Sequence, residues 1–355
     1  MRIATSTGGG DAPGLNAVIR AAVLAAVHRG WECFGVRRGF GSLLGESDLM
    51  PLGPNEVRGI THLGGTILGT SNRGNPLKWR VQRPDGSWEE RDRSQEVFDA
   101  FRANRLDALI TIGGDGTLGI ALELCKKGLP VVGVPKTIDN DVGGTVTTFG
   151  YDTAVSIATD AIDKLHTTAE SHERVMVVEV MGRHAGFIAL SAGLAGSADI
   201  ILIPEIPFDI NKVCDKVRRR EAEGRHFSIV VAAEGAVPKG GTVSLIDPEH
   251  ARLGGIADKV AHSIEEMTGK ETRSLVLGHL QRGGSPTTFD RLLGLRFGAG
   301  AIRLVAEQNF GMMVALQPPR IVPVPIADAV ATPRRVALDS DTIATARDLG
   351  TSFGD

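Results

Sequence analysis

The sequence predicts an α/β protein made of two Rossmann-like, three-layer domains with mostly parallel sheets. Short apolar runs alternate with amphipathic segments along the chain, which is typical of βα units around a parallel sheet. The 355 residues, 42% of them hydrophobic and 23% charged, suffice for two globular domains of ordinary size. The 45 glycines suit tight turns between strands and helices, and loops that approach a ligand closely.

Each expected element rests on its local pattern. Strands are expected at short apolar runs, and helices at the longer amphipathic segments that follow them. In chain order, these elements are a strand at 1–7, a helix at 15–28, a strand at 108–112, a helix at 118–127, a strand at 129–134, a helix at 153–167, strands at 174–180, 200–203, 228–232 and 273–277, and a helix at about 288–306. The polar residues 72–93 are expected to form an exposed excursion, and residues 318–325 an extended connector.

Charge and cysteine usage exclude several classes of protein. The formal net charge of −3 leaves no broad basic field to attract nucleic acid or an anionic membrane. The cysteines at 33, 125 and 214 are odd in number and form no CxxC pair, so neither a disulfide framework nor a zinc site is expected. The sequence begins without an apolar signal core, and no apolar run reaches the ~18 residues of a membrane span. A cytoplasmic protein is therefore expected.

Two glycine loops follow predicted strands and precede predicted helices. The first reads TGGGDAPGLN at 7–16, and the second reads IGGDGTLG at 112–119. Glycines at such a turn let backbone N–H groups face an anion at the helix N-terminus. In the second loop, Asp115 can hold Mg²⁺ and Thr117 can donate a hydrogen bond. Either loop alone leaves open a plain strand-to-helix turn, with Asp115 as a helix cap.

The segment PKTIDND at 135–141 carries the most specific chemistry. If the chain is extended there, Thr137, Asp139 and Asp141 project to one side, because side chains alternate along a strand. One carboxylate can take the proton from an attacking hydroxyl. The other can help to position a metal ion or keep the first carboxylate oriented. A solvated acidic turn is the alternative, and it is disfavoured because the segment follows a strand that reads as buried.

Four motifs together resemble the phosphofructokinase family. They are GGDGT, PKTIDND, MGRHAG at 181–186 and LGHLQRGGSP at 277–286, in the order and approximate spacing of that family, and the resemblance runs from residue 1 to about residue 310. It implies Mg²⁺-dependent transfer of a phosphoryl group to the 1-hydroxyl of fructose 6-phosphate, without a covalent enzyme intermediate. NAD kinases and lipid kinases also use GGDGT, but PKTIDND and HLQRGGSP argue against them.

The resemblance also implies roles for individual residues. Asp139 matches the catalytic base, and Asp115 matches the metal-binding carboxylate. The other catalytic residues that it implies are Thr137, Asp141, Arg183 and Gly10. The donor-binding residues that it implies are Gly10, Arg73, Gly114, Asp115, Gly116, Thr117 and Lys136.

A similar set is implied for fructose 6-phosphate. Glu234 matches the carboxylate that accepts from sugar hydroxyls, and His279 and Arg282 match binders of the 6-phosphate. The other substrate-binding residues are Thr137, Asp139, Met181, Gly182, Arg183, Arg174 and Arg273. Family members supply the last two from a neighbouring subunit, so a homodimer or homotetramer is implied. A dianionic phosphate needs several cations, and planar guanidinium groups bind its oxygens in pairs.

The sequence favours ATP as the donor and leaves pyrophosphate as the alternative. Gly116 agrees with ATP-dependent relatives, because an Asp there would exclude the α-phosphate by volume and charge. Lys136 is common in pyrophosphate-dependent relatives, but it can attract either donor. A distant alternative is a regulatory subunit that binds sugar phosphate without catalysis. It is disfavoured because Asp115, Asp139 and Asp141 are all present.

We therefore expect two α/β domains with the active site in the cleft between them, where strands end and helices begin. The first domain, residues 1–150 plus 281–330, is expected to bind the phosphoryl donor. The second, residues 151–280 plus 331–355, is expected to bind most of the fructose 6-phosphate.

Overall fold

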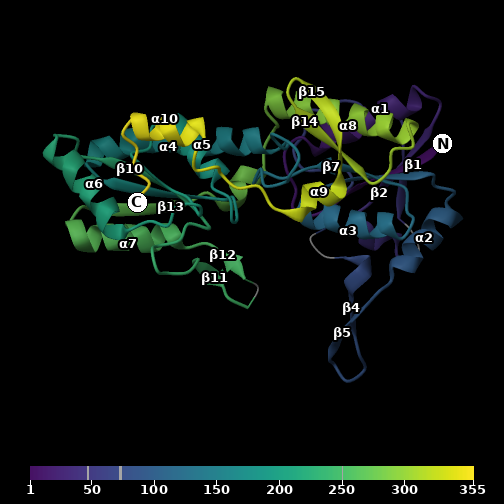
Figure 1. The fold of residues 1–355 in the computed structure, drawn as a ribbon, viewed down its shortest axis with the longest axis horizontal. Helices are drawn as coiled ribbons and strands as arrows, with labels where there is room; N and C mark the ends of the chain where they lie inside the picture. The colour runs from purple at the N-terminus through teal and green to yellow at the C-terminus, as the bar shows by residue number, and fades with distance from the viewer. Residues whose placement is uncertain (46–47, 72–73, 250) are drawn as a thin grey trace. The chain divides into compact units, whose positions relative to one another are not determined.

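The computed structural model describes residues 1–45, 48–71, 74–249 and 251–355 (Figure 1). The contacts within the chain divide it into two compact units. The first unit comprises Met1–Thr137, Val142–Gly150 and Arg282–Pro333, and the second comprises Ile138–Asp141, Tyr151–Gln281 and Arg334–Asp355. The acidic residues of PKTIDND thus cluster with the second unit. Which substrate each unit binds stays a prediction.

The first unit is built on a seven-stranded sheet in the order β15-β14-β7-β6-β1-β2-β3. Its strands are β1 (Arg2–Thr7), β2 (Glu32–Val36), β3 (Leu49–Leu52), β6 (Ala108–Gly113), β7 (Val131–Pro135), β14 (Met312–Gln317) and β15 (Arg320–Pro325). The strands from β14 to β2 pair in parallel, and β3 and β15 are antiparallel edge strands. The expected connector at 318–325 is therefore mostly a strand, and its prolines are tolerated because an edge strand bonds on one side only.

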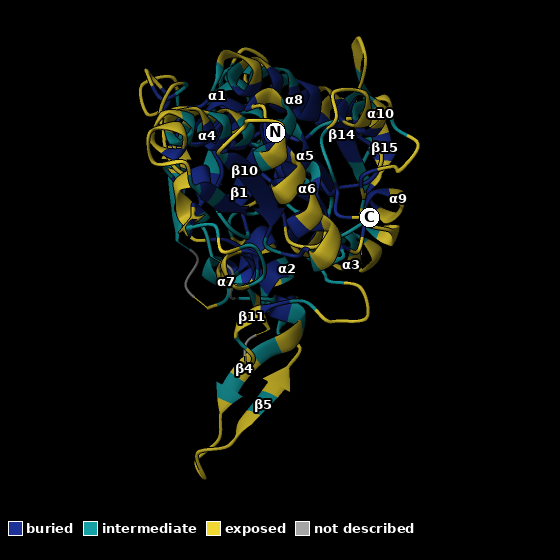
Figure 2. Ribbon diagram, turned by 90° about the vertical axis from the view of Figure 1, so that its left-hand side faces the viewer, coloured by how far each residue is buried: buried dark blue, intermediate teal, exposed yellow. Residues whose placement is uncertain are grey.

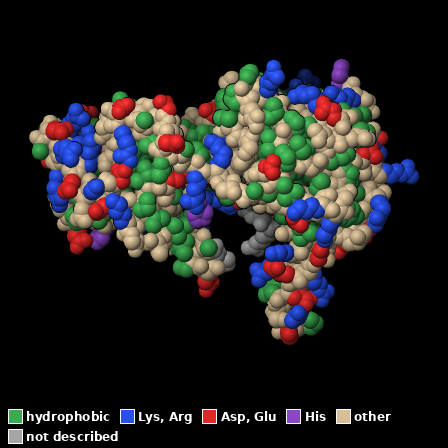
Figure 3. Space-filling model, in the orientation of Figure 1, with side chains coloured by type: hydrophobic (Ala, Val, Ile, Leu, Met, Phe, Trp, Pro, Cys, Tyr) green, Lys and Arg blue, Asp and Glu red, His purple; other side chains and the backbone are tan. Residues whose placement is uncertain are grey.

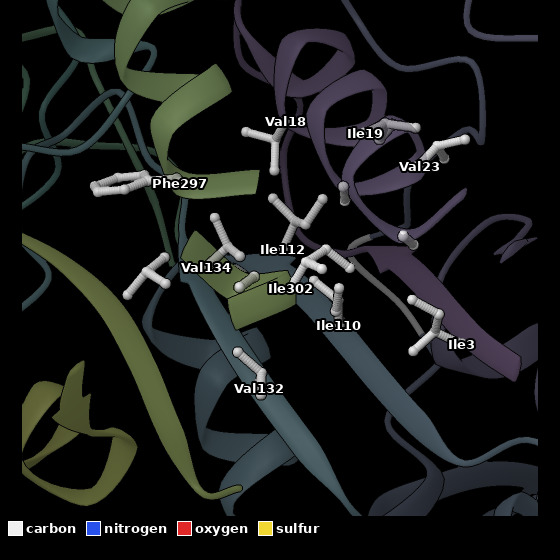
Figure 4. Close-up of a cluster of buried hydrophobic side chains, with 14 of the residues drawn as sticks. Ile3, Val18, Ile19, Val23, Ile110, Ile112, Val132, Val134, Phe297 and Ile302 are labelled. Carbon is white, nitrogen blue, oxygen red and sulfur yellow. The ribbon is translucent and has the colours of Figure 1, made fainter. Parts of the chain in front are cut away.

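Helices cover both faces of this sheet. They are α1 (Leu15–Val27), α2 (Ser94–Ala103), α3 (Asp115–Lys126), α8 (Thr288–Ala306) and α9 (Ile326–Ala331), with a 3₁₀ turn η1 (Phe40–Leu43). On one face, Ile110 and Val132 of the sheet meet Val18 of α1 and Phe297 of α8 in one buried cluster (Figure 4). On the other face, the alternate strand residues, such as Leu109, pack with α2 and α3. The first unit thus has the predicted three layers.

The expected excursion at 72–93 contains an ordered hairpin. A 3₁₀ turn, η2 (Pro76–Lys78), leads into the antiparallel pair β4 (Trp79–Gln82) and β5 (Trp88–Arg91). The pair extends away from the rest of the first unit, and acidic and basic side chains are mixed along it (Figures 2 and 3). The Arg80 guanidinium stacks over the exposed Trp88 ring at 5.4 Å from its centre, which covers part of that apolar surface.

The second unit is built on a four-stranded parallel sheet in the order β13-β8-β10-β9. Its strands are β8 (Val175–Val180), β9 (Ile200–Leu202), β10 (Ser228–Ala233) and β13 (Thr272–Val276), with a separate short pair of β11 (Leu245–Asp247) and β12 (Arg252–Leu253). Its helices are α4 (Tyr151–His172), α5 (Phe187–Ala195), α6 (Ile210–Ala222), α7 (Ile256–Thr268) and α10 (Asp341–Asp348), and the 3₁₀ turn η3 (Gly278–Arg282) follows β13. α6 and α7 pack on Val177 and Val230. α4 contacts β8 and β10, and α5 contacts β9 and β10.

The predicted fold class is confirmed, and the elements that were predicted differ from the observed ones mainly at polar ends. α3 begins at Asp115, three residues before the predicted start, because an acidic first turn suits the positive end of a helix. α4 continues to His172, beyond the predicted end at 167, through residues that are mostly exposed and therefore lack an apolar pattern. Several observed helices are missing from the predicted elements, among them α2, α5, α6 and α7. α6 has a strongly polar face and is capped by Asp209. No helix in the described part of the chain is long and apolar enough to span a membrane.

Candidate functional site

In the first unit, three of the predicted motifs leave the sheet at one edge. β1, β6 and β7 are parallel neighbours whose ends are in register, with Thr7 opposite Ile112 and Gly113 opposite Pro135. Gly8 N donates to Ile112 O at 3.0 Å, which carries the ladder into the first glycine loop. The GGG loop, the GGDGT loop and the start of PKTIDND therefore lie side by side at the carboxyl ends of their strands.

The two glycine loops pack against each other through Thr117. This side chain is buried in the first turn of α3. A Cβ at Gly8 would lie 2.7 Å from Thr117 Cγ2, and a Cβ at Gly113 would lie 2.3 Å from Thr117 Cβ, so a larger residue at either position would clash. Asp115 and Gly116, in contrast, are exposed at the start of the same helix. Thr117 thus supports the loops from inside, and its predicted contact with the donor stays a prediction.

Two cations lie beside the first glycine loop. The Lys136 ammonium donates to Gly10 O, and Arg282 Nη1 donates to Asp11 O at 3.0 Å. A Cβ at Gly10 would lie 2.8 Å from Arg282 Nη1, so the guanidinium and the loop backbone are in close contact. Lys136 is buried, and Arg282 is half-buried. A phosphate at this loop would meet both charges as well as backbone N–H groups.

The PKTIDND segment turns between its two aspartates. Thr137, Asp139 and Asp141 are buried, and Asn140 has a φ of 58°, in the left-handed region that asparagine tolerates better than most residues. The expectation of a straight extended segment is therefore wrong, because side chains do not alternate regularly through such a turn. In the first unit, Thr148 Oγ1 donates to Thr137 O at 2.7 Å and ties the start of the segment to the chain that follows it.

In the second unit, Asp139 lies near an arginine of the MGRHAG motif. Arg183 Nε is 3.9 Å from Asp139 Oδ2; the aspartate side chain is 5% exposed and the arginine side chain is 57% exposed. Such a long pair with one exposed partner contributes little to stability. Most of the arginine side chain is therefore accessible to an anion from solvent.

Glu234 fixes the backbone of the same motif. Its Oε1 accepts hydrogen bonds from Arg183 N at 2.9 Å and Gly182 N at 3.3 Å. A Cβ at Gly235 would lie 1.9 Å from Arg183 O, so the loop can approach β10 this closely only because glycine follows Glu234. Burial raises the pKa of Glu234, the two backbone donors lower it, and the neighbouring Asp139 charge raises it further.

Arg334 belongs to the same surroundings and was missed by sequence reasoning. Its backbone N donates to Asp141 O at 2.7 Å, and its Nη1 donates to Asn140 Oδ1 at 3.4 Å. Its guanidinium lies over the Phe187 ring at 4.9 Å from the ring centre. Burial lowers the pKa of Arg334, and the negative charge of Asp141 opposes that shift. No local pattern could reveal this contact, because 194 residues separate Arg334 from Asn140.

The two arginines that the resemblance assigns to a neighbouring subunit share a carboxylate. Arg174 Nη2 lies 2.8 Å from Glu271 Oε1, and Arg273 pairs with the same oxygen. The pKa of Glu271 is lowered, first by its hydrogen bond from Arg174. Glu271 thus holds the two guanidinium groups close together at the start of β13.

Three further predicted residues complete the set. Met181 follows β8 directly and is half-buried, and His279 is exposed in η3. Arg73, expected beside the transferring phosphoryl, lies outside the described residues.

Known proteins of one family are similar to this chain over nearly its whole length. A family model described as Phosphofructokinase matches residues 2–305. An ATP-dependent 6-phosphofructokinase of Chloroflexus aggregans is 54% identical, over 100% of this chain and 98% of its own length. A pyrophosphate–fructose 6-phosphate 1-phosphotransferase of Amycolatopsis mediterranei is 51% identical, over 96% of this chain and 97% of its own. The crystal structure of Pichia pastoris phosphofructokinase in the T-state is 30% identical with a TM-score of 0.81; the match covers 99% of this chain and 37% of that longer one.

The raised pKa of Glu234 predicts that this residue lowers the free energy of unfolding as pH rises. The folded protein binds this proton more readily than the unfolded chain, so the contribution of Glu234 to the free energy of unfolding falls as pH rises above about 4.3, the ordinary pKa of glutamate. Glu234→Gln keeps a carbonyl acceptor but cannot ionise. We expect the stability of this variant, relative to the wild type, to increase between about pH 4 and pH 7 in urea unfolding.

Glu265→Gln, at an exposed position of α7, is the matched control and should show no such trend. A constant difference between Glu234→Gln and the wild type across this pH range would contradict the raised pKa.

Proposed function

The chain belongs to the phosphofructokinase family, and we propose that it transfers a phosphoryl group from ATP to the 1-hydroxyl of fructose 6-phosphate, giving fructose 1,6-bisphosphate. The observation that carries this proposal is the buried Asp139 carboxylate with the exposed Arg183 guanidinium 3.9 Å away. The carboxylate can accept the proton that the attacking hydroxyl releases, and the guanidinium can offset charge on the phosphoryl oxygens. The name ATP-dependent 6-phosphofructokinase is carried by relatives that are 54% identical.

The glycine loops of the first unit support the phosphoryl donor in this proposal. The GGDGT loop opens α3, so the backbone N–H groups of its first turn and the positive end of the helix can face a phosphate. Lys136 adds a cation at the neighbouring loop. Together these groups can orient a phosphate chain and offset its charge, and such positioning with electrostatic stabilisation is most of what phosphoryl transfer needs.

Asp115 fits the role of the carboxylate that would hold Mg²⁺. It is the exposed first residue of α3, directly after the glycine loop. Across the described residues, no three His, Cys, Asp or Glu side chains gather into a metal cage. This suits Mg²⁺, which takes one or two carboxylates from the protein and completes its shell with phosphate oxygens and water. When bound, the ion neutralises charge that develops on the transferring phosphoryl group.

The second unit supplies the groups proposed for the sugar. Glu234 holds the backbone of Gly182 and Arg183, and its carboxylate has further acceptor capacity for sugar hydroxyls. His279 is exposed and can reach an anionic ligand, as the resemblance implies for the 6-phosphate. Asp139 then takes the proton from the 1-hydroxyl oxygen as that oxygen attacks phosphorus in line.

Pyrophosphate is the second candidate donor. The relative from Amycolatopsis mediterranei carries the name of a pyrophosphate-dependent enzyme at 51% identity, close to the identity of the relatives named for ATP. Lys136, buried against the first glycine loop, can attract the terminal phosphate of either donor. Turnover of fructose 6-phosphate with each donor, measured side by side, distinguishes the two candidates.

Asp139→Asn is expected to lower kcat by a factor on the order of 10²–10⁴, because it keeps the size of the side chain but removes the proton acceptor. The KM for fructose 6-phosphate should change much less, since the carboxylate acts mainly in the transition state. The measurement is formation of fructose 1,6-bisphosphate under initial-rate conditions, with thermal unfolding to verify folding. A folded variant with a kcat close to that of the wild type would rule out Asp139 as the base.

Gly116→Asp is expected to reduce kcat/KM for ATP more than kcat/KM for pyrophosphate, and the two reductions should differ by a factor on the order of 10². The reason is that the aspartate charge would lie close to the charge of the ATP α-phosphate, and like charges placed close together cost several kcal/mol. No heavy atom lies within 4 Å of a Cβ at this position, so the Cβ of the new side chain meets no clash in the free protein. Gly116→Ala is the matched control, since it adds the Cβ without the charge, and it should change both values less than about threefold. Equal losses with both donors in the Asp variant would mean that Gly116 does not select the donor.

We also propose a homodimer or homotetramer in which Arg174 and Arg273 complete the site of a neighbouring subunit. Both guanidinium groups pair with the same carboxylate, Glu271, and therefore lie close together. The edge strand β13 also exposes the apolar side chains of Leu275 and Val276. An exposed apolar edge of this kind is suited to contact with another chain.

Mixing inactive Arg174→Ala subunits with inactive Asp139→Asn subunits should restore part of the activity, because a hybrid brings an intact arginine to an intact aspartate. A mixture of Arg174→Ala with Arg273→Ala is the control. It should restore nothing, since each subunit lacks one arginine of the pair that it donates. If the subunits exchange and the first mixture stays inactive, the shared site is wrong.

A further inference from the structure

The segment at residues 334–336 contacts two loops that matter for the proposed reaction. Arg334 N donates to Asp141 O at 2.7 Å, which ties the segment to the acidic turn. Two residues later, Val336 N donates to Glu205 Oε1 at 2.9 Å, and Val336 is buried. The same Glu205 oxygen accepts from Gly186 N at 3.1 Å, at the end of the MGRHAG motif. The segment is thus fastened beside both motifs.

The Arg334 side chain strengthens the contact with the acidic turn. Its guanidinium stacks on Phe187, the first residue of α5, and its Nη1 reaches Asn140 Oδ1. Phe187 is itself held in place, because Tyr151 packs edge-on against its ring and donates to its backbone oxygen at 3.1 Å. The cation therefore has a fixed support on one side and the acidic turn on the other.

The turn at Asn140 is stabilised by such a support. Asparagine adopts a φ of 58° more readily than most residues, but the conformation is still sparsely populated and surrounding contacts favour it. Arg334 bonds to the side chain of Asn140 and to the backbone of the next residue, Asp141. Two aspartates of like charge flank this turn, and a cation beside it reduces the repulsion that would open it.

We propose that Arg334 is a positioning residue for phosphoryl transfer, holding the turn at Asn140 so that the Asp139 carboxylate faces Arg183. The inference rests on the proposed function, since it gives Arg334 a role through the proposed base. Arg334 lies beyond residues 2–305, which the family model matches, and outside the four motifs. Its role comes from the tertiary contacts alone.

The test compares variants of Arg334 with a neighbour on the same segment. Arg334→Met keeps an apolar stem over Phe187 but removes the charge and the donors. Arg334→Lys keeps the charge and one donor group. Arg335→Met is the matched control, because Arg335 is the next residue and is exposed. The readouts are kcat and KM for fructose 6-phosphate and for the donor, with thermal unfolding of each protein.

For Arg334→Met we expect a kcat lower by about 10- to 100-fold, since misplacing a reacting group by about 1 Å costs on this order. Both KM values should change less than about threefold, because the variant binds substrate but misplaces the base. Arg334→Lys should have a kcat between those of Arg334→Met and the wild type, because lysine keeps the charge but not the planar stack on Phe187. Arg335→Met should match the wild type. A role in stability alone would lower the unfolding temperature without this split between kcat and KM.

The outcomes separate this inference from the proposed function. A wild-type protein that phosphorylates fructose 6-phosphate with neither donor refutes the proposed function. An active wild type with a folded Arg334→Met of normal kcat, or with Arg334→Lys no better than Arg334→Met, overturns the positioning role. Arg334→Gln replaces Arg334→Met if that protein does not fold. If neither neutral variant folds, Arg334 serves folding and the inference is overturned.

Discussion

The register of three parallel strands is the constraint on which the donor loops depend. Because β1, β6 and β7 are neighbours and end level, segments more than a hundred residues apart in sequence leave the sheet at one edge. Backbone hydrogen bonds continue from the strands into the loops, as between Gly8 N and Ile112 O. A shift of one residue in this register would turn each side chain of the shifted strand to the opposite face of the sheet. It would also move the loops out of alignment. The position of Lys136 beside Gly10 is a consequence of the same register.

In the second unit, the loops are held in place by carboxylate side chains that accept hydrogen bonds from backbone N–H groups. Glu234 accepts from the N–H groups of Gly182 and Arg183, and Glu205 accepts from Gly186 and Val336. These carboxylates do for irregular loops what a neighbouring strand does for a strand: they pair N–H groups that would otherwise lose their hydrogen bonds on burial. The cost is the burial of charge, which is visible in the raised pKa of Glu234.

Two cations predicted to take part in the reaction, Lys136 and Arg183, differ in how far they are buried. Lys136 is buried against a carbonyl oxygen, whereas Arg183 is mostly exposed and lies 3.9 Å from Asp139 Oδ2. A buried cation in fixed contact can serve as a permanent counter-charge for a phosphate. An exposed cation with a long pair can follow a group that moves during reaction. Both kinds suit a transfer in which charge is held at one phosphate and develops at another.

Prediction from the sequence identified the family, because the family's motifs are short. GGDGT, PKTIDND and MGRHAG each carry a local signal, because glycines mark turns and carboxylates follow buried strands. It failed where the signal is spread over the chain. The left-handed turn at Asn140 contradicts the expected extended segment, since alternation says nothing about a φ that surrounding contacts impose. Thr117 illustrates the same limit, because its burial between Gly8 and Gly113 depends on the packing of two loops.

The sequence by itself determined the α/β class, the family and the set of polar groups available for phosphoryl transfer, because periodicity and motifs are local properties of the chain. Only the tertiary structure decided how these groups are held. It brought Arg334 to the acidic turn across 194 residues and gave Glu271 two arginines to hold. The physical reason is that a hydrogen bond or an ion pair depends on distance in space, and strand order and helix packing set that distance independently of separation in sequence.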